Sequence, residues 1–196
     1  MADFEKAFEV MIRHEAFQRR DGTWIYWIDD PDDSGGQTAW GWSMLTIQRE
    51  IKSGRMVEAD LGLTLPLSDP RCLATMTLST ARKLYRAHFW EPLMCGAIDD
   101  QRVATKVFDF GVNAGKWRTI LFAQETVNQL NRVCELAEDA QVGPLTIAGI
   151  NTVEPDKFLI EFGRRMEAHY RDQVVKKPAN AKFLEKQWLP RAHWVG

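Results

Sequence analysis

Apolar residues near the start of the chain recur at helical spacing. Phe4, Phe8, Met11 and Ile12 predict an amphipathic helix. Glu15 follows Phe4 by eleven residues, and it falls on the same face because each helical residue turns by about 100°. The apolar stripe of this helix therefore ends in a carboxylate.

Between residues 21 and 42 the pattern changes to β-strand and turn chemistry. Residues 23–28 are aromatic and β-branched, and residues 29–36 consist of Asp, Pro, Ser and Gly. We therefore predict a small β-hairpin or three-strand patch near residues 21–42.

Helical patterning dominates the rest of the chain. Ser43 is expected to cap a helix that ends before Gly54, and residues 55–76 are expected to be irregular. Further helices are predicted at about residues 77–90, 101–114, 116–132, 144–151 and 155–175, with a shorter one after Pro178. The fold class is therefore mainly α (α+β).

The composition is that of a globular protein. Of 196 residues, 45% are hydrophobic and 27% are charged, which excludes disordered and collagen-like chains. A chain of this size can bury about 70% of its surface. Eight residues are Trp, and four of them fall within nineteen residues: Trp24, Trp27, Trp40 and Trp42. The other four are expected to anchor the helical core: Trp90, Trp117, Trp188 and Trp194.

The net charge of −2 argues against nucleic acid as a partner. Residues 155–196 carry nine Lys or Arg and five Asp or Glu, a net charge of +4. This surplus suits an anionic polymer, although a solvated helix face is the favoured interpretation.

Cysteine usage and the hydropathy pattern bear on location. The three Cys are widely spaced and have no His at metal-binding spacing, so we expect reduced thiols. We expect no signal peptide, because the first residues lack an apolar run, and no membrane span, because no apolar run reaches 18 residues. The protein is expected to be synthesised in the cytoplasm.

The candidate chemistry is hydrolysis of a sugar acetal. That reaction needs a carboxylic acid that stays protonated near neutral pH, and Glu15 at the end of an apolar stripe is placed for this role. It also needs a second polar group that stabilises positive charge or positions water, for which Asp32 and Thr38 are the candidates. Alternative carboxylates are Asp29, Asp30 and Asp33. Exposed rings that sugars can stack on are expected at Trp24, Trp27, Trp40 and Trp42.

Three ordered signatures carry a family resemblance. His14-Glu15, followed by Asp30 to Thr38 and Gly41, resembles the catalytic motif of glycoside hydrolase family 108, the phage-type N-acetylmuramidases. Residues 107–115 resemble the second signature of that family. Residues 139–146 and 183–191 are similar to the peptidoglycan-binding segment predicted to accompany it.

The resemblance implies a lysozyme-like helical fold and cleavage of the β-1,4 bond between N-acetylmuramic acid and N-acetylglucosamine. It assigns Glu15 as general acid, and Asp32 and Thr38 as the groups that stabilise charge or position water. It also implies that Asn113 lines the cleft. Residues 1–96 would form the catalytic region and residues 97–196 a helical peptidoglycan-binding-like region, packed into one compact unit.

The same resemblance implies a set of partners. The substrate would be the glycan strands of bacterial peptidoglycan, reached after release to the wall by a holin-type partner. We expect a monomer with neither cofactor nor metal.

Two departures from the family pattern leave alternatives open. Ala16-Phe17 stand where the family usually has two glycines, and about nine extra residues separate Glu15 from the Asp cluster. That cluster can also be read as a plain turn. As a calcium loop it lacks the bidentate Glu at its twelfth position, which is Gly41. Other functions are a non-catalytic cell-wall-binding or secretion-assisting protein, and a chitin or chitosan hydrolase.

Overall fold

The computed structural model describes residues 1–29, 37–69, 71–131 and 135–196. It divides into two compact units, each of which is described by itself. The larger unit comprises Met1–Phe8 and Ala87–Gly196, and the smaller unit comprises Glu9–Arg86. The expected division into residues 1–96 and 97–196 stays a prediction.

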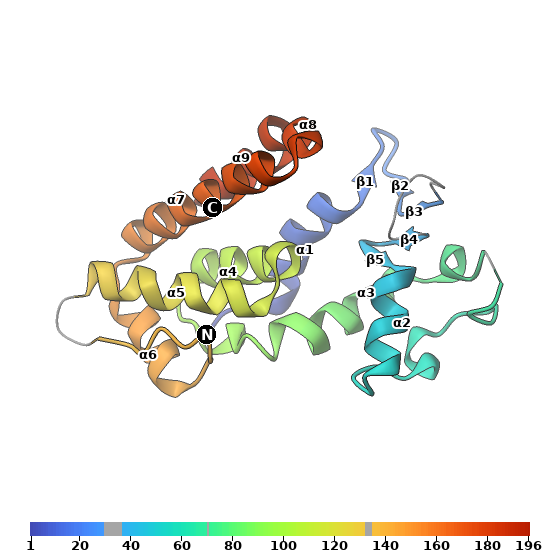
Figure 1. Cartoon of the computed structure of the whole chain (residues 1–196). Coiled ribbons are helices and arrows are strands. Elements are labelled where there is room, and N and C mark those ends of the chain that lie inside the picture. The colour runs from blue at the N-terminus through green and yellow to red at the C-terminus, as the bar shows by residue number, and fades with distance from the viewer. Residues whose placement is uncertain (30–36, 70, 132–134) are drawn as a thin grey trace. The chain divides into compact units, whose positions relative to one another are not determined.

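Helices build the larger unit. Its core lies between α4 (Gln101–Ala114), α5 (Lys116–Leu130) and α7 (Pro155–Lys176), which pack pairwise against one another (Figure 1). Fully buried rings fill the space between them, among them Phe108, Phe110, Phe158, Phe162 and Tyr170. Shorter elements complete the unit: α6 (Pro144–Thr152), α8 (Ala181–Phe183) and α9 (Leu189–His193), with a π-helical turn at Leu184–Trp188 and 3-10 turns at Cys95–Ala97 and Pro178–Asn180. The sequence-based helix positions in this region are confirmed.

A buried ion pair fixes the C-terminal segment to α4. The Arg191 Nε lies 3.0 Å from a carboxylate oxygen of Asp109, and both side chains are only 6% exposed. Beside them the Lys106 Nζ donates hydrogen bonds to the carbonyls of Ala192 and Trp194 at 2.6 and 2.7 Å. Burial lowers the pKa of Lys106 to about 8. Two regions that the sequence shows as separate signatures, residues 107–115 and 183–191, therefore meet through this pair.

Replacing Arg191 by Met is expected to destabilise the protein by about 3 to 5 kcal/mol, because the change leaves a buried carboxylate without its guanidinium. Chemical denaturation measures the change. The control is Lys176→Met, which removes the exposed pair with Asp172 and is expected to cost less than about 0.5 kcal/mol. Equal losses in the two variants would contradict the prediction.

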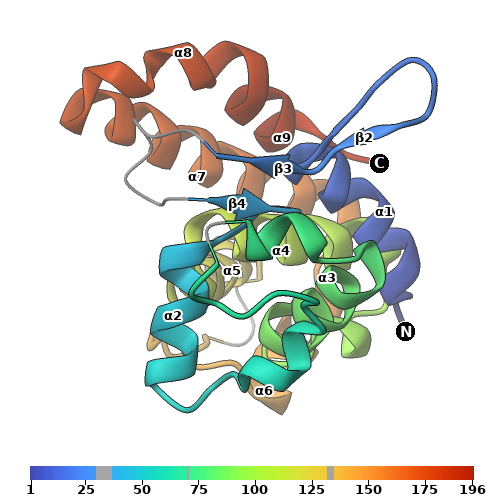
Figure 2. The ribbon, with the colours of Figure 1, turned by 90° about the vertical axis from the view of Figure 1, so that its right-hand side faces the viewer.

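In its described residues, the smaller unit contains the end of α1 (Phe4–Glu15), five short strands and two α-helices, α2 (Met44–Lys52) and α3 (Leu78–Tyr85). β1 (Phe17–Gln18) pairs with β2 (Trp24–Ile25), and β3 (Trp27–Ile28) pairs with β4 (Thr38–Ala39), which pairs with β5 (Trp42–Ser43). All pairings are antiparallel, and β3 and β4 lie side by side in Figure 2. The expected β patch is confirmed as a two-stranded ladder and a three-stranded sheet.

Local capping explains the helix limits in this unit. The Ser43 side chain accepts a hydrogen bond from the Thr46 N–H at the start of α2, and Gly54 after its end has φ +71°. Thr77 caps α3 in the same way. Between them the chain forms 3-10 turns at Glu58–Leu61 and Cys72–Thr75, and a π-helical turn at Arg86–Trp90 follows α3. These features confirm the expected Ser43 cap, the helix end before Gly54 and the largely irregular stretch.

One expected core residue is not in the core. Trp90 is buried, and Trp188 and Trp194 are partly buried, but Trp117 is 62% exposed, so the expectation that it anchors the core is wrong. It lies in the first turn of α5, whereas the buried face of that helix begins with Thr119 and Ile120.

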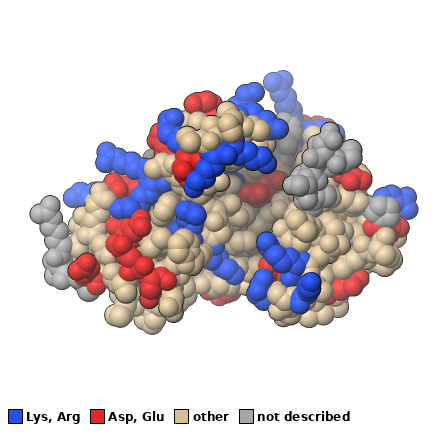
Figure 3. Space-filling model, in the orientation of Figure 1, with Lys and Arg blue, Asp and Glu red and all other residues tan. Residues whose placement is uncertain are grey.

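Several basic side chains of the C-terminal region pair with acidic neighbours. Arg165 pairs with Glu125, Arg171 with Glu167, and Lys176 with Asp172. In Figure 3 blue and red side chains are interspersed over the C-terminal helices at the top of the view. This pattern favours a solvated helix surface. No helix in the described part of the chain has the length and apolar content needed to cross a bilayer.

Candidate active site around Glu15

Glu15 is the last residue of α1 and lies in the smaller unit. The N–H of Ala16 donates to the Ile12 carbonyl at 2.8 Å, so helical hydrogen bonding continues past Glu15 before the chain enters β1. The Glu15 side chain is partly buried, whereas the neighbouring His14 is exposed. The carboxylate thus lies at the boundary between core and solvent, as the apolar stripe predicts.

A tight hairpin turn joins β4 to β5. Ala39 is opposite Trp42 in the sheet, so Trp40 and Gly41 are the two turn residues. Both have positive φ, +51° and +83°, which is the signature of a type I′ turn. Trp is an unusual residue at such a position, because a side chain in the left-handed region costs about 1 kcal/mol or more.

Contacts on every side of Trp40 offset that cost. Its indole Nε1 donates to the Met76 carbonyl at 3.0 Å, and its ring stacks on Tyr26 with centroids 4.6 Å apart. Trp24 packs edge-on against the same ring at 5.8 Å. The Tyr85 hydroxyl donates to the Trp40 carbonyl at 2.8 Å. The turn is therefore held in one conformation by α3 and by the neighbouring strands.

The turn packs directly against Glu15. A Cβ atom placed on Gly41 would lie 2.9 Å from the Glu15 Cβ and 3.1 Å from its Oε2, and it would overlap the Tyr85 hydroxyl. Glycine is therefore required at position 41 both for its φ and for its size. Tyr85 had no signal in the sequence, because its role comes from the packing of α3 beside the turn.

The structure describes only two of the other predicted catalytic residues, Thr38 and Asp29. Thr38 is partly buried in β4, between Ile28 of β3 and Ser43 of β5. Asp29 is exposed directly after β3. Asp30, Asp32 and Asp33 lie outside the described residues, and so do Ser34 and Gly35 of the alternative calcium loop. Among the residues that are described, no cluster of three His, Cys, Asp or Glu side chains is arranged to hold a metal.

The expected sugar-binding aromatics divide into two pairs. Trp40 and Trp42 are only 5% and 3% exposed, so the expectation that all four rings face solvent is wrong for these two. Their burial follows from the turn, which directs Trp40 onto Tyr26 and Trp42 onto Tyr85, with ring centroids 5.4 Å apart in the second pair. Trp24 and Trp27 are partly exposed. Asn113 is exposed near the end of α4 in the larger unit.

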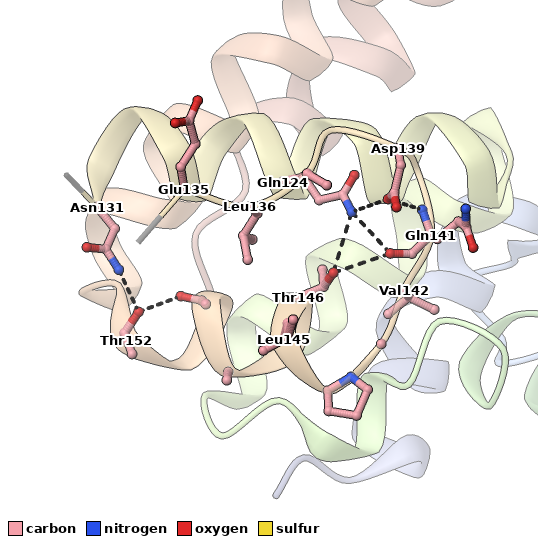
Figure 4. Close-up of a pocket in the computed structure, with 15 residues that line it drawn as sticks. Gln124, Asn131, Glu135, Leu136, Asp139, Gln141, Val142, Leu145, Thr146 and Thr152 are labelled. Atoms are coloured by element: carbon pink, nitrogen blue, oxygen red, sulfur yellow. Dashed lines mark hydrogen bonds between the residues drawn. The ribbon is translucent and has the colours of Figure 1, made fainter. Parts of the chain in front are cut away.

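The segment that resembles a peptidoglycan-binding region borders a pocket of about 470 Å³ in the larger unit (Figure 4). The buried Gln124 occupies one wall. Its Nε2 donates to Asp139 at 2.8 Å and to the Gln141 carbonyl at 3.1 Å, and its Oε1 accepts from the Ala140 N–H at 2.9 Å. The hydrogen bonds from the Gln141 N–H and from Gln124 lower the pKa of Asp139. The polar side chain of Asp139 therefore fastens its own loop to α5.

Comparison with known proteins adds a family and a fold. The family model described as glycosyl hydrolase 108 matches residues 14–115, a span that includes Glu15, the β patch and the whole of α4. A solved structure of Brucella abortus SagA is similar, with a TM-score of 0.66 and 20% sequence identity, over 98% of this chain and 90% of that one. No curated protein sequence matches significantly. The expected mainly helical, lysozyme-like fold is confirmed.

Proposed function

Because the chain belongs to the glycosyl hydrolase 108 family, we propose that it is a peptidoglycan hydrolase that cleaves the β-1,4 bond between N-acetylmuramic acid and N-acetylglucosamine. Glu15 is the general acid in this proposal. The observation that supports it most is the close packing of the Trp40-Gly41 turn against the Glu15 side chain, with a Gly41 Cβ position only 3.1 Å from Oε2. A group that protonates one particular glycosidic oxygen must be held in place, and this turn holds it.

Departure of the leaving group places positive charge on the sugar ring, and a second polar group must stabilise that charge or position water. In our proposal Thr38 and Asp32 supply it. Thr38 belongs to β4, the strand that leads into the turn against Glu15. The carboxyl separation that distinguishes inversion from retention involves Asp32, which is outside the described residues.

The test of the proposed reaction is the identity of the new chain ends. Purified peptidoglycan is incubated with the protein, the products are reduced with borohydride, and the fragments are analysed by mass spectrometry. Reduced muramic acid at the new ends is expected. Reduced glucosamine at those ends, or no new ends, would contradict the proposed bond specificity.

The same assay separates the alternative functions. A wall-binding protein without catalytic activity sediments with peptidoglycan and releases no reducing ends. A chitin or chitosan hydrolase releases reducing ends from those polymers at a rate at least equal to its rate on peptidoglycan.

We also propose that the protein is a monomer and that it acts on the bacterial cell wall after release by a holin-type partner. Co-expression with and without a membrane-permeabilising protein, followed by a lysis assay, tests this part.

A further inference from the structure

Trp117 is the bulkiest of the strongly exposed apolar side chains in the described part of the larger unit. It lies in the first turn of α5 and is 62% exposed. An isolated exposed Leu or Val is ordinary in a folded protein, whereas Trp is enriched at interaction surfaces. Core packing therefore does not explain this Trp.

Two cations flank Trp117, and neighbouring aromatic rings hold each of them. The Lys116 Nζ donates to the His88 carbonyl at 3.0 Å and lies 5.9 Å from the centre of the Phe89 ring. The Arg118 guanidinium carbon lies 6.0 Å from the centre of the Phe122 ring. Within the described ranges neither cation lies within ion-pair distance of a carboxylate. Their charges are therefore available to a partner.

The helix geometry puts the two cations on opposite flanks of Trp117. Successive side chains of a helix project about 100° apart, so Lys116 and Arg118 lie roughly 160° apart around α5, with the indole of Trp117 between them in projection. The residue before the helix is Gly115, and no side chain there caps the N-terminus of α5. The N–H groups of the first turn therefore add partial positive charge at the same end. We call Lys116, Trp117 and Arg118 the Trp117 surface.

We propose that the Trp117 surface binds an anionic glycan, with a sugar ring stacked on the indole and carboxylates paired with Lys116 and Arg118. The flat indole offers an apolar face to the C–H face of a pyranose, and the cations offer charge complementarity. This inference rests on the proposed function, because peptidoglycan combines sugar rings with the free carboxylates of its stem peptides and of those muramic acid lactyl groups that carry no peptide. Neutral chitin has the rings without the carboxylates.

Binding to insoluble peptidoglycan tests the inference, measured by sedimentation in a Glu15→Gln background, with released soluble sugar monitored in the same tubes. Trp117→Ala is expected to raise the apparent Kd by about tenfold, whereas Trp117→Phe keeps most of the affinity. The matched control is Val175→Ala, which trims a 79% exposed apolar side chain on α7 of the same unit. If Trp117→Ala binds as tightly as this control, the inference is wrong.

A separate binding experiment tests the role of the two cations. The double variant Lys116→Gln/Arg118→Gln is expected to lose affinity for native peptidoglycan and to show a weaker salt dependence. Its affinity for peptidoglycan with chemically amidated carboxylates, and for chitin, is expected to match that of the parent protein. Equal losses on native and amidated material would overturn the proposed recognition of carboxylates.

A second copy of the chain is the competing occupant of this surface. If Trp117→Ala turns a dimer into a monomer in sedimentation equilibrium and leaves peptidoglycan binding unchanged, the surface serves self-association and the proposal is wrong. Hydrolysis by the unaltered protein is measured in parallel. Binding that depends on Trp117 without hydrolysis contradicts the proposed function alone, and hydrolysis without such binding contradicts this inference alone.

Discussion

Replacing Glu15 by Gln is expected to lower turnover on peptidoglycan by about a thousandfold, because the amide has no proton to give to the leaving oxygen and general acid catalysis typically contributes 10²- to 10⁴-fold. Gln has nearly the same shape, and Glu15 is partly buried at a helix end. The KM and the thermal midpoint are therefore expected to change little. Release of reducing ends under initial-rate conditions measures the effect.

The matched control for this variant is Glu9→Gln, which changes an exposed carboxylate earlier on the same helix. It is expected to keep full activity. If Glu15→Gln also keeps its activity, Glu15 is not the general acid and the carboxylates after β3 have to be reconsidered.

Replacing Gly41 by Ala is expected to lower kcat by about a hundredfold, because the new methyl group would lie 2.9 Å from the Glu15 Cβ and would force the carboxyl away from its position. The φ of +83° adds backbone strain of about 1 kcal/mol. The KM is expected to change less than kcat, since the displaced group acts in the chemical step. Initial rates across substrate concentrations separate the two parameters.

Gly54→Ala is the control for backbone strain. Gly54 has a similar φ of +71°, and no atom lies within 4 Å of the position its Cβ would take. This variant is expected to be slightly destabilised and fully active. If it loses as much activity as Gly41→Ala, the effect at position 41 comes from backbone strain alone.

A second substitution tests the contact more directly. Tyr85→Phe removes the hydroxyl that the Gly41→Ala methyl would overlap, at the cost of the hydrogen bond to the Trp40 carbonyl. The double variant is expected to recover part of the stability that Gly41→Ala loses. Additive losses in thermal unfolding would show that the two residues do not share a contact.

Much of the fold could be predicted from the sequence because its signals act over a few residues. Ser43 and Thr77 accept hydrogen bonds at the starts of their helices, and α4 ends at Ala114 directly before Gly115. Apolar spacing placed Glu15 at the end of a stripe, and the structure places its side chain at the edge of the core. These features depend on local hydrogen bonding and on helical periodicity, and both are encoded by residues close together in the sequence.

Other parts of the site could not be predicted in this way. The expected exposure of Trp40 and Trp42 is wrong, because a type I′ turn directs both rings toward Tyr26 and Tyr85, partners that come from other elements. Tyr85 itself lies 45 residues after the carbonyl that it holds. No local pattern encodes such a distance.

The sequence by itself determined the helices, their caps, the family and the position of Glu15 at the end of an apolar helix face. Only the tertiary structure decided that Gly41 packs against Glu15, that Asp109 meets Arg191, and that Trp117 stays exposed. The physical reason is that burial and contact are properties of two surfaces. The periodicity of one helix shows which face is apolar. Which side chains on that face become buried depends on the element that packs against it.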